Sequence, residues 1–78
     1  MLNLYGMRIR PAGPGTIPKD GFKGMVKYEL LEKYNKENQT NFLDLVVYDR
    51  KLLEEEVRDY QMNKLGKISE EDYKKIMF

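Results

Sequence analysis

The chain has 78 residues, enough for one small hydrophobic core but not for two that could each offset the entropy of folding. Hydrophobic residues make up 41% of the sequence and charged residues 35%, as in soluble globular proteins, so we expect a single domain over residues 1–78. The net charge is +1 and there is no cysteine or histidine, which excludes disulfides, thiolate metal sites and catalysis by either side chain.

Charge is distributed unevenly along the chain. Residues 1–27 carry five cationic side chains and one acid, whereas residues 41–78 carry nine acids and seven cations. No apolar run approaches the roughly 18 residues of a membrane span, and the start of the chain does not resemble a signal peptide. We therefore expect a cytoplasmic protein without a membrane partner and without a cofactor.

The first expected element is a strand over residues 2–10, in which Gly6 would form a bulge. Three prolines then exclude a helix, and residues 7–24 form a loop rich in glycine and in cationic side chains. This loop allows two interpretations, an anion-binding loop or a rigid connector. It lacks the spacing of a Walker or dinucleotide-binding loop, and its prolines remove amide donors, which favours the connector.

Residues 22–34 fit two patterns. Val26, Leu30 and Tyr34 have helical spacing, while Val26, Tyr28 and Leu30 alternate as in a strand, and Gly24 with the aromatic residues favours a strand. Residues 35–41 form a polar turn-forming cluster, and residues 42–48 give the clearest strand pattern of the chain. Together these segments predict a long hairpin.

The last third of the chain predicts two helices. Apolar residues recur every three or four positions over residues 50–65, with Asp49 placed to cap this helix and Gly66 placed to end it. A second, short helix over residues 69–77 would be capped by Ser69. The fold class is then α+β: an antiparallel sheet of two to three strands covered by one helix, plus a short C-terminal helix. Such a sheet would leave one face open, which favours a homodimer.

Catalytic and metal-binding patterns are weak. Glu54, Glu55 and Glu56 are consecutive and would point about 100° apart on a helix, so they cannot converge on one ion. Ser69 has no base nearby to activate it as a nucleophile. We therefore predict no catalytic residues, no metal site and no enzymatic activity.

Three short motifs carry a resemblance to a known group. The order "MRIRP", "PKDGF" and "FLDLVVYDRKLLEEEVRDYQMNKLG" resembles small uncharacterised proteins encoded by phages and mobile elements of Gram-positive bacteria. The resemblance spans residues 7–66 and implies a genetic context. Such genomes favour short non-enzymatic binders that block a host component, so the resemblance implies a binding protein.

We predict an interaction protein, acting as an inhibitor or modulator of a host macromolecule, most simply a host protein. The first alternative is a protein that sequesters a nucleotide or another anion, and the second is a weak binder of single-stranded nucleic acid that stacks bases on strand tyrosines. The predicted contact surface combines cationic side chains of the loop with apolar neighbours: Arg8, Arg10, Lys19, Lys23, Tyr5 and Phe22.

Overall fold

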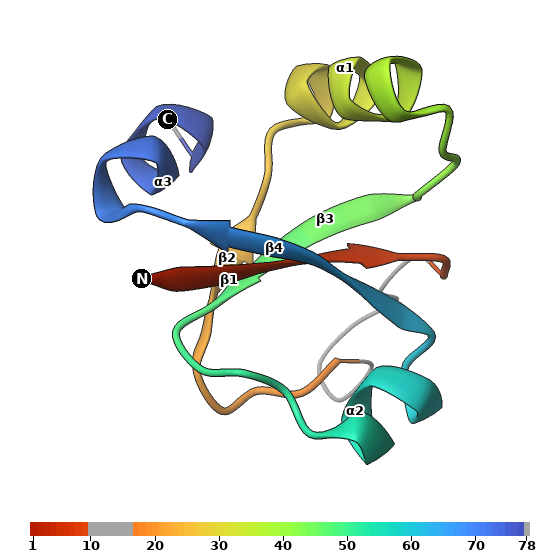
Figure 1. Ribbon diagram of the computed structural model, residues 1–78, viewed down its shortest axis with the longest axis vertical. Coiled ribbons are helices and arrows are strands. Elements are labelled where there is room, and N and C mark those ends of the chain that lie inside the picture. The colour runs from red at the N-terminus through yellow and green to blue at the C-terminus, as the bar shows by residue number, and fades with distance from the viewer. Residues whose placement is uncertain (10–16, 78) are drawn as a thin grey trace.

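A computed structural model describes residues 1–9 and 17–77 of the chain (Figure 1). Its elements follow in the order β1 (Leu2–Met7), β2 (Phe22–Met25), α1 (Tyr28–Asn38), β3 (Asp44–Tyr48), α2 (Glu54–Asp59), β4 (Met62–Ile68) and α3 (Glu70–Met77). The fold class is α+β, and the strands pair antiparallel, as expected. The sheet has four strands, however, instead of two or three, and more than one helix covers it.

The strands lie in the order β2-β3-β1-β4, so the N-terminal strand is an inner strand. Both of its neighbours come much later in the sequence: Tyr5 pairs with Val46 of β3 and with Lys64 of β4. Gly6 is not a bulge. It leaves room for the ring of Phe42, whose atoms would lie 2.8 Å from a Cβ at this position.

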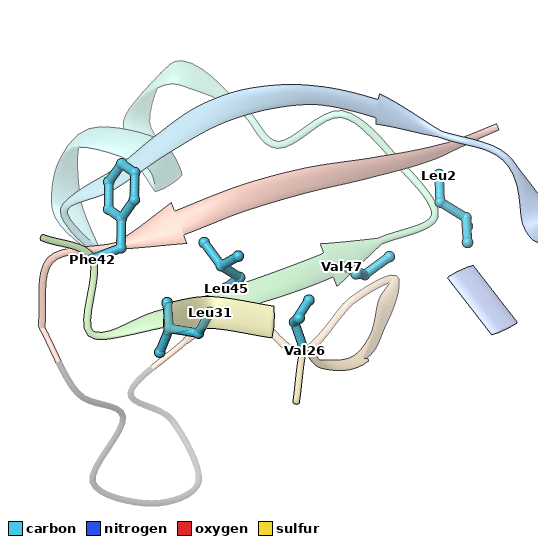
Figure 2. Packing of buried hydrophobic residues seen from close by; sticks show 6 residues of the cluster. All are labelled: Leu2, Val26, Leu31, Phe42, Leu45 and Val47. Atoms are coloured by element: carbon cyan, nitrogen blue, oxygen red, sulfur yellow. The ribbon is translucent and has the colours of Figure 1, made fainter. Parts of the chain in front are cut away.

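Both faces of the sheet are buried. Successive residues of a strand point to opposite faces, and in β3 Leu45 and Val47 enter one core cluster while Val46 and Tyr48 enter the other. Helices α1 and α3 lie over the first face and α2 over the second (Figure 1), and Figure 2 shows the first cluster. Its buried members are Leu2, Val26, Leu31, Phe42, Leu45 and Val47. We predicted a homodimer because we expected one face of the sheet to be open. In the described part of the chain both faces are covered, so the prediction of an open face is wrong.

Helix α1 occupies most of the segment for which a strand was favoured. The helical spacing prevails because Leu30, Leu31 and Tyr34 face the sheet, whereas Tyr28, which the strand pattern placed inside, is 65% exposed. Long unbranched side chains between these positions also favour a helix. The helix ends at Gln39, whose φ of 54° is left-handed, within the predicted turn-forming cluster.

Strand β4 replaces the C-terminal part of the helix predicted over residues 50–65. Helix α2 has only six residues, and the chain reverses at Gln61, whose φ is 52°. Gly66 does not cap a helix. It lies inside β4 with a φ of 141°, next to a register shift that leaves Leu65 as the extra residue opposite β1.

The other edge strand, β2, is interrupted in the same way. Its register shift leaves Lys23 as the extra residue, followed by Gly24 with a φ of 140°. Bulges and lysines on edge strands disfavour pairing with a strand of another chain. Across residues 1–9 and 17–77, none of the helices has the length and apolar character needed to span a bilayer.

Candidate binding groove

The residues predicted as one contact surface do not lie together. Arg8 follows the C-terminal end of β1, whereas Phe22 pairs with Tyr48, which in turn pairs with Asn3 near the start of β1. At about 3.3 Å per strand residue, Arg8 and Phe22 are about 17 Å apart along the strands. Lys23 follows Phe22 in β2, so it too lies toward the other end of the sheet from Arg8. Arg10 lies outside the described residues.

The strand tyrosines do not form a stacking platform for nucleic acid. Tyr5 and Tyr48 have no exposed surface, and their rings pack edge to face with centroids 6.0 Å apart. The Tyr5 hydroxyl accepts a hydrogen bond from the backbone N–H of Leu52 at 2.9 Å. Tyr5 is therefore a core residue, and the expectation that it is a surface contact is wrong.

Lys19 begins a tight turn that leads into β2, and Lys23 lies in β2 directly after this turn. The N–H of Phe22 donates to the Lys19 carbonyl at 3.2 Å, and Gly21 has a φ of 79°, which suits the third position of a type II turn. A Cβ on Gly21 would lie 2.6 Å from Asp49 Oδ1. Glycine is thus required both by the backbone conformation and by the close approach of the chain end of β3.

Three consecutive residues at the end of β3 hold this turn. Each donates a hydrogen bond to a different carbonyl of the segment Pro18–Gly21. The bonds run from the Tyr48 hydroxyl to Pro18 (2.6 Å), from the Asp49 N–H to Gly21 (2.8 Å) and from Arg50 Nε to Asp20 (2.8 Å). Burial raises the pKa of Tyr48 to about 12, which keeps this phenol protonated as a donor. The motifs "PKDGF" and "YDR" therefore form one structural unit.

Arg50 also links the turn to helix α2. Its guanidinium forms a bidentate pair with Glu56, and Glu56 Oε1 accepts a hydrogen bond from the N–H of Leu53 at 2.9 Å. These hydrogen bonds, first that from Arg50 and then that from Leu53, lower the pKa of Glu56 to about 2. The helix begins at Glu54 with Leu53 at its N-cap position, so the prediction that Asp49 caps it is wrong. At α3, by contrast, Ser69 Oγ accepts a hydrogen bond from the N–H of Asp72 at 3.1 Å.

A groove of about 520 Å³ lies between α2 and the adjoining ends of β1 and β4. Leu52, Val57 and Met62 form its apolar floor, above the buried ring of Tyr5. Four cationic side chains line it, each from a different segment: Arg8 after β1, Lys51 before α2, Arg58 in α2 and Lys64 in β4. We call this set the cationic groove.

The cationic groove has an excess of positive charge in a chain whose net charge is +1. Glu54 is the one carboxylate in its lining. Arg58 lies 3.5 Å from Asp59, but both side chains are more than half exposed, where ion pairs contribute little. Within residues 1–9 and 17–77, Arg8, Lys51 and Lys64 form no ion pair. The groove therefore attracts negatively charged groups.

Only Arg8 of the cationic groove was among the predicted site residues. The helix predicted over residues 50–65 contained the other three, Lys51, Arg58 and Lys64. No local pattern identifies the groove because its cations come together only when β4 pairs with β1 and α2 packs against β4. Among the described residues, no group of three or more potential ligands could hold a metal ion.

The fold and the groove define a small α+β protein with a groove lined by four cationic side chains. The chain belongs to the family described as "Defence against restriction A C-terminal", whose model matches residues 1–67. This family is associated with phages and mobile elements, which agrees with that part of the resemblance, whereas the three motifs themselves are not confirmed by the match. No curated protein and no solved structure matches the chain.

Proposed function

We propose that this chain is a non-enzymatic protein of a phage or mobile element that protects DNA from restriction by binding the host restriction machinery. The observation that carries the proposal is the family match over residues 1–67, which includes the whole sheet apart from Ile68. Restriction acts on DNA inside the host cell, so the protein would act in the cytoplasm. It would act as an inhibitor that remains bound to its target.

The available side chains support binding in preference to catalysis. The sequence has neither histidine nor cysteine, and its one serine, Ser69, holds the start of α3. The hydrogen bonds from Arg50 lower the pKa of Glu56 and keep its carboxylate ionised. This carboxylate is therefore a poor proton donor at neutral pH. We therefore expect the protein to inhibit its target by stoichiometric binding.

The test is a restriction assay on purified components. A host restriction endonuclease is incubated with increasing amounts of the chain before unmodified DNA is added, and cleavage is followed over time. We expect inhibition to depend on the ratio of chain to enzyme and to be insensitive to the amount of DNA. Expression of the chain in a restricting host should raise the plating efficiency of unmodified phage.

Two outcomes would contradict the proposal. If a trace of chain inactivated many equivalents of enzyme, the chain would be a catalyst. If inhibition disappeared as DNA was added in excess, the chain would act by coating DNA, in line with the alternative of a nucleic-acid binder. The matched control uses DNA that carries the host modification, which the chain should leave unaffected.

A nucleotide or anion sequesterer is the second candidate, and only the cationic groove favours it. The loop on which this candidate was predicted, with Arg8, Arg10, Lys19 and Lys23, lies partly outside the described residues, and Arg8 lies about 17 Å from Phe22 along the strands. A sequesterer would raise the melting temperature of the chain at micromolar nucleotide through linkage.

A further inference from the structure

We propose that the cationic groove binds an acidic segment of a partner protein, one in which carboxylates flank an apolar side chain. The inference rests on the proposed function in one respect: it takes the partner to be a protein of the restriction machinery. Arg8, Lys51, Arg58 and Lys64 would bind the carboxylates, and the apolar side chain would lie on Leu52, Val57 and Met62.

Charge complementarity is the first argument. Four cationic side chains stand on separate segments around one groove, against the single carboxylate of Glu54. Separate cations of this kind suit several carboxylates spaced along a peptide better than one compact anion, which needs donors that converge on a point. The groove is also open to solvent along its length, so it would not enclose a small anion.

The second argument is the composition of the floor. Leu52 and Met62 are only 3% and 4% exposed, and Val57 is partly buried in the same core cluster, so the floor is a fixed part of the core. An apolar floor with a charged rim is the arrangement of protein interfaces, in which the centre is apolar and the periphery polar.

The surroundings of the groove disfavour nucleic acid. A DNA duplex carries one negative charge per about 1.7 Å, so phosphates on either side of the groove would meet α2. That helix exposes Glu54, Glu55 and Asp59. A protein segment with a few carboxylates avoids this repulsion because its charges are discrete.

Strand addition is also disfavoured as the mode of binding. The edge of β4 next to the groove carries Lys64 and Lys67 and is interrupted at Leu65 and Gly66 by the bulge. The partner segment would then bind through its side chains in the groove instead of extending the sheet.

The direct test is a nuclear magnetic resonance titration of the whole chain, with methyl signals of Leu52, Val57 and Met62 as reporters. The probe is a short synthetic peptide that alternates glutamate and leucine, at low ionic strength. We expect these methyl signals to shift, and Arg58→Glu/Lys64→Glu to weaken the affinity at least about tenfold. The control, Lys27→Glu/Lys36→Glu, makes the same charge change on exposed residues at α1 and should alter affinity by less than about twofold.

Several results would overturn the inference. A peptide with glutamine in place of glutamate that bound equally well would remove the role of charge. A single-stranded oligonucleotide or inorganic phosphate that shifted the same methyl signals at lower concentration than the acidic peptide would make the groove a nucleic-acid or anion site. A titration in which none of these probes moved the signals would show that the groove is not a binding site.

The same variants in the restriction assay separate this inference from the proposed function. A native chain that gives no protection contradicts the proposed function and leaves the titration to decide the groove. If the native chain and Arg58→Glu/Lys64→Glu protect equally, the proposed function stands and the inference about the groove fails. We expect protection to be lost in the groove variant and kept in Lys27→Glu/Lys36→Glu.

Discussion

Arg50 and Glu56 face each other through two parallel hydrogen bonds, Nη1 to Oε1 at 2.8 Å and Nη2 to Oε2 at 2.9 Å. The same guanidinium donates through Nε to the carbonyl of Asp20, and the same carboxylate accepts from the N–H of Leu53. One ion pair therefore ties the turn before β2 to the start of α2, two segments about 30 residues apart in the sequence.

Replacing Glu56 should change how stability depends on pH. Its pKa is lowered from 4.5 to about 2, and a carboxyl with a lowered pKa stabilises the fold above its ordinary pKa and loses that effect as pH falls toward the folded value. Between pH 4.5 and about 2 the native chain should therefore lose more stability than Glu56→Gln does. Urea unfolding midpoints measured across this range test the difference.

Glu55→Gln is the matched control for this prediction, because Glu55 is an exposed neighbour on the same helix. It should keep the pH dependence of the native chain. If Glu56→Gln and the native chain lost stability in parallel, the ion pair seen here would not persist in solution.

Removing the hydroxyl of Tyr48 should destabilise the fold. Tyr48→Phe leaves the carbonyl of Pro18 without its donor at a buried position, where the expected cost is about 1–2 kcal/mol. Tyr73→Phe removes a bond of similar length, to the carbonyl of Lys23, at an exposed position and should cost less than about 0.5 kcal/mol. Chemical denaturation of both variants measures the two costs, and equal losses would mean that burial does not set the difference.

Alanine at Gly21 should be more costly than alanine at Gly66. Both glycines have positive φ, 79° and 141°, so both substitutions strain the backbone, at about 1 kcal/mol or more. At Gly21 the new Cβ would also lie 2.6 Å from Asp49 Oδ1, whereas at Gly66 it meets no atom within 4 Å. The melting temperatures of the two variants compare backbone strain with a steric clash, at Gly21, and backbone strain without one, at Gly66. A larger loss for Gly66→Ala would contradict this interpretation of the turn.

Ser69 and Asp49 should respond differently to alanine. Ser69→Ala removes the side chain that accepts the N–H of Asp72 and should cost about 1 kcal/mol through the lost cap of α3. Asp49 is exposed, and the N-cap residue of α2 is Leu53, further along the chain. Asp49→Ala should therefore change the free energy of unfolding by less than about 0.5 kcal/mol. Urea denaturation measures both, and a loss of about 1 kcal/mol for Asp49→Ala would restore the predicted cap.

Elements whose signals are local were predictable. β1 and β3 appear where apolar and β-branched residues concentrate, although β3 starts at Asp44, two residues later than expected, and β1 ends at Met7. Helix α3 follows Ser69 because a serine three residues before the acid Asp72 suits a helix start. In each case, neighbours within a few positions supply the reason for the structure.

The segment around Tyr28 was not decided by local pattern, because its apolar residues satisfy both periods. Packing against the sheet selects the helix. As a helix, the segment buries Leu31, which is 4% exposed, in the first core cluster over the sheet that contains β2 and β3. The strand prediction for residues 22–34 is confirmed over Phe22–Met25 and is wrong from Tyr28 onward, where the run of long unbranched side chains favours a helix.

The amino-acid order thus accounts for the α+β class, the clearest strand and the start of α3 after Ser69. The fourth strand and the cationic groove depend instead on contacts between segments about 60 residues apart, such as Tyr5 with Lys64. A segment such as β4 becomes a strand because it pairs with the edge of another strand. That strand lies far away in the sequence, so the local pattern of β4 does not reveal the pairing. Arg8, Arg58 and Lys64 share a groove for the same reason.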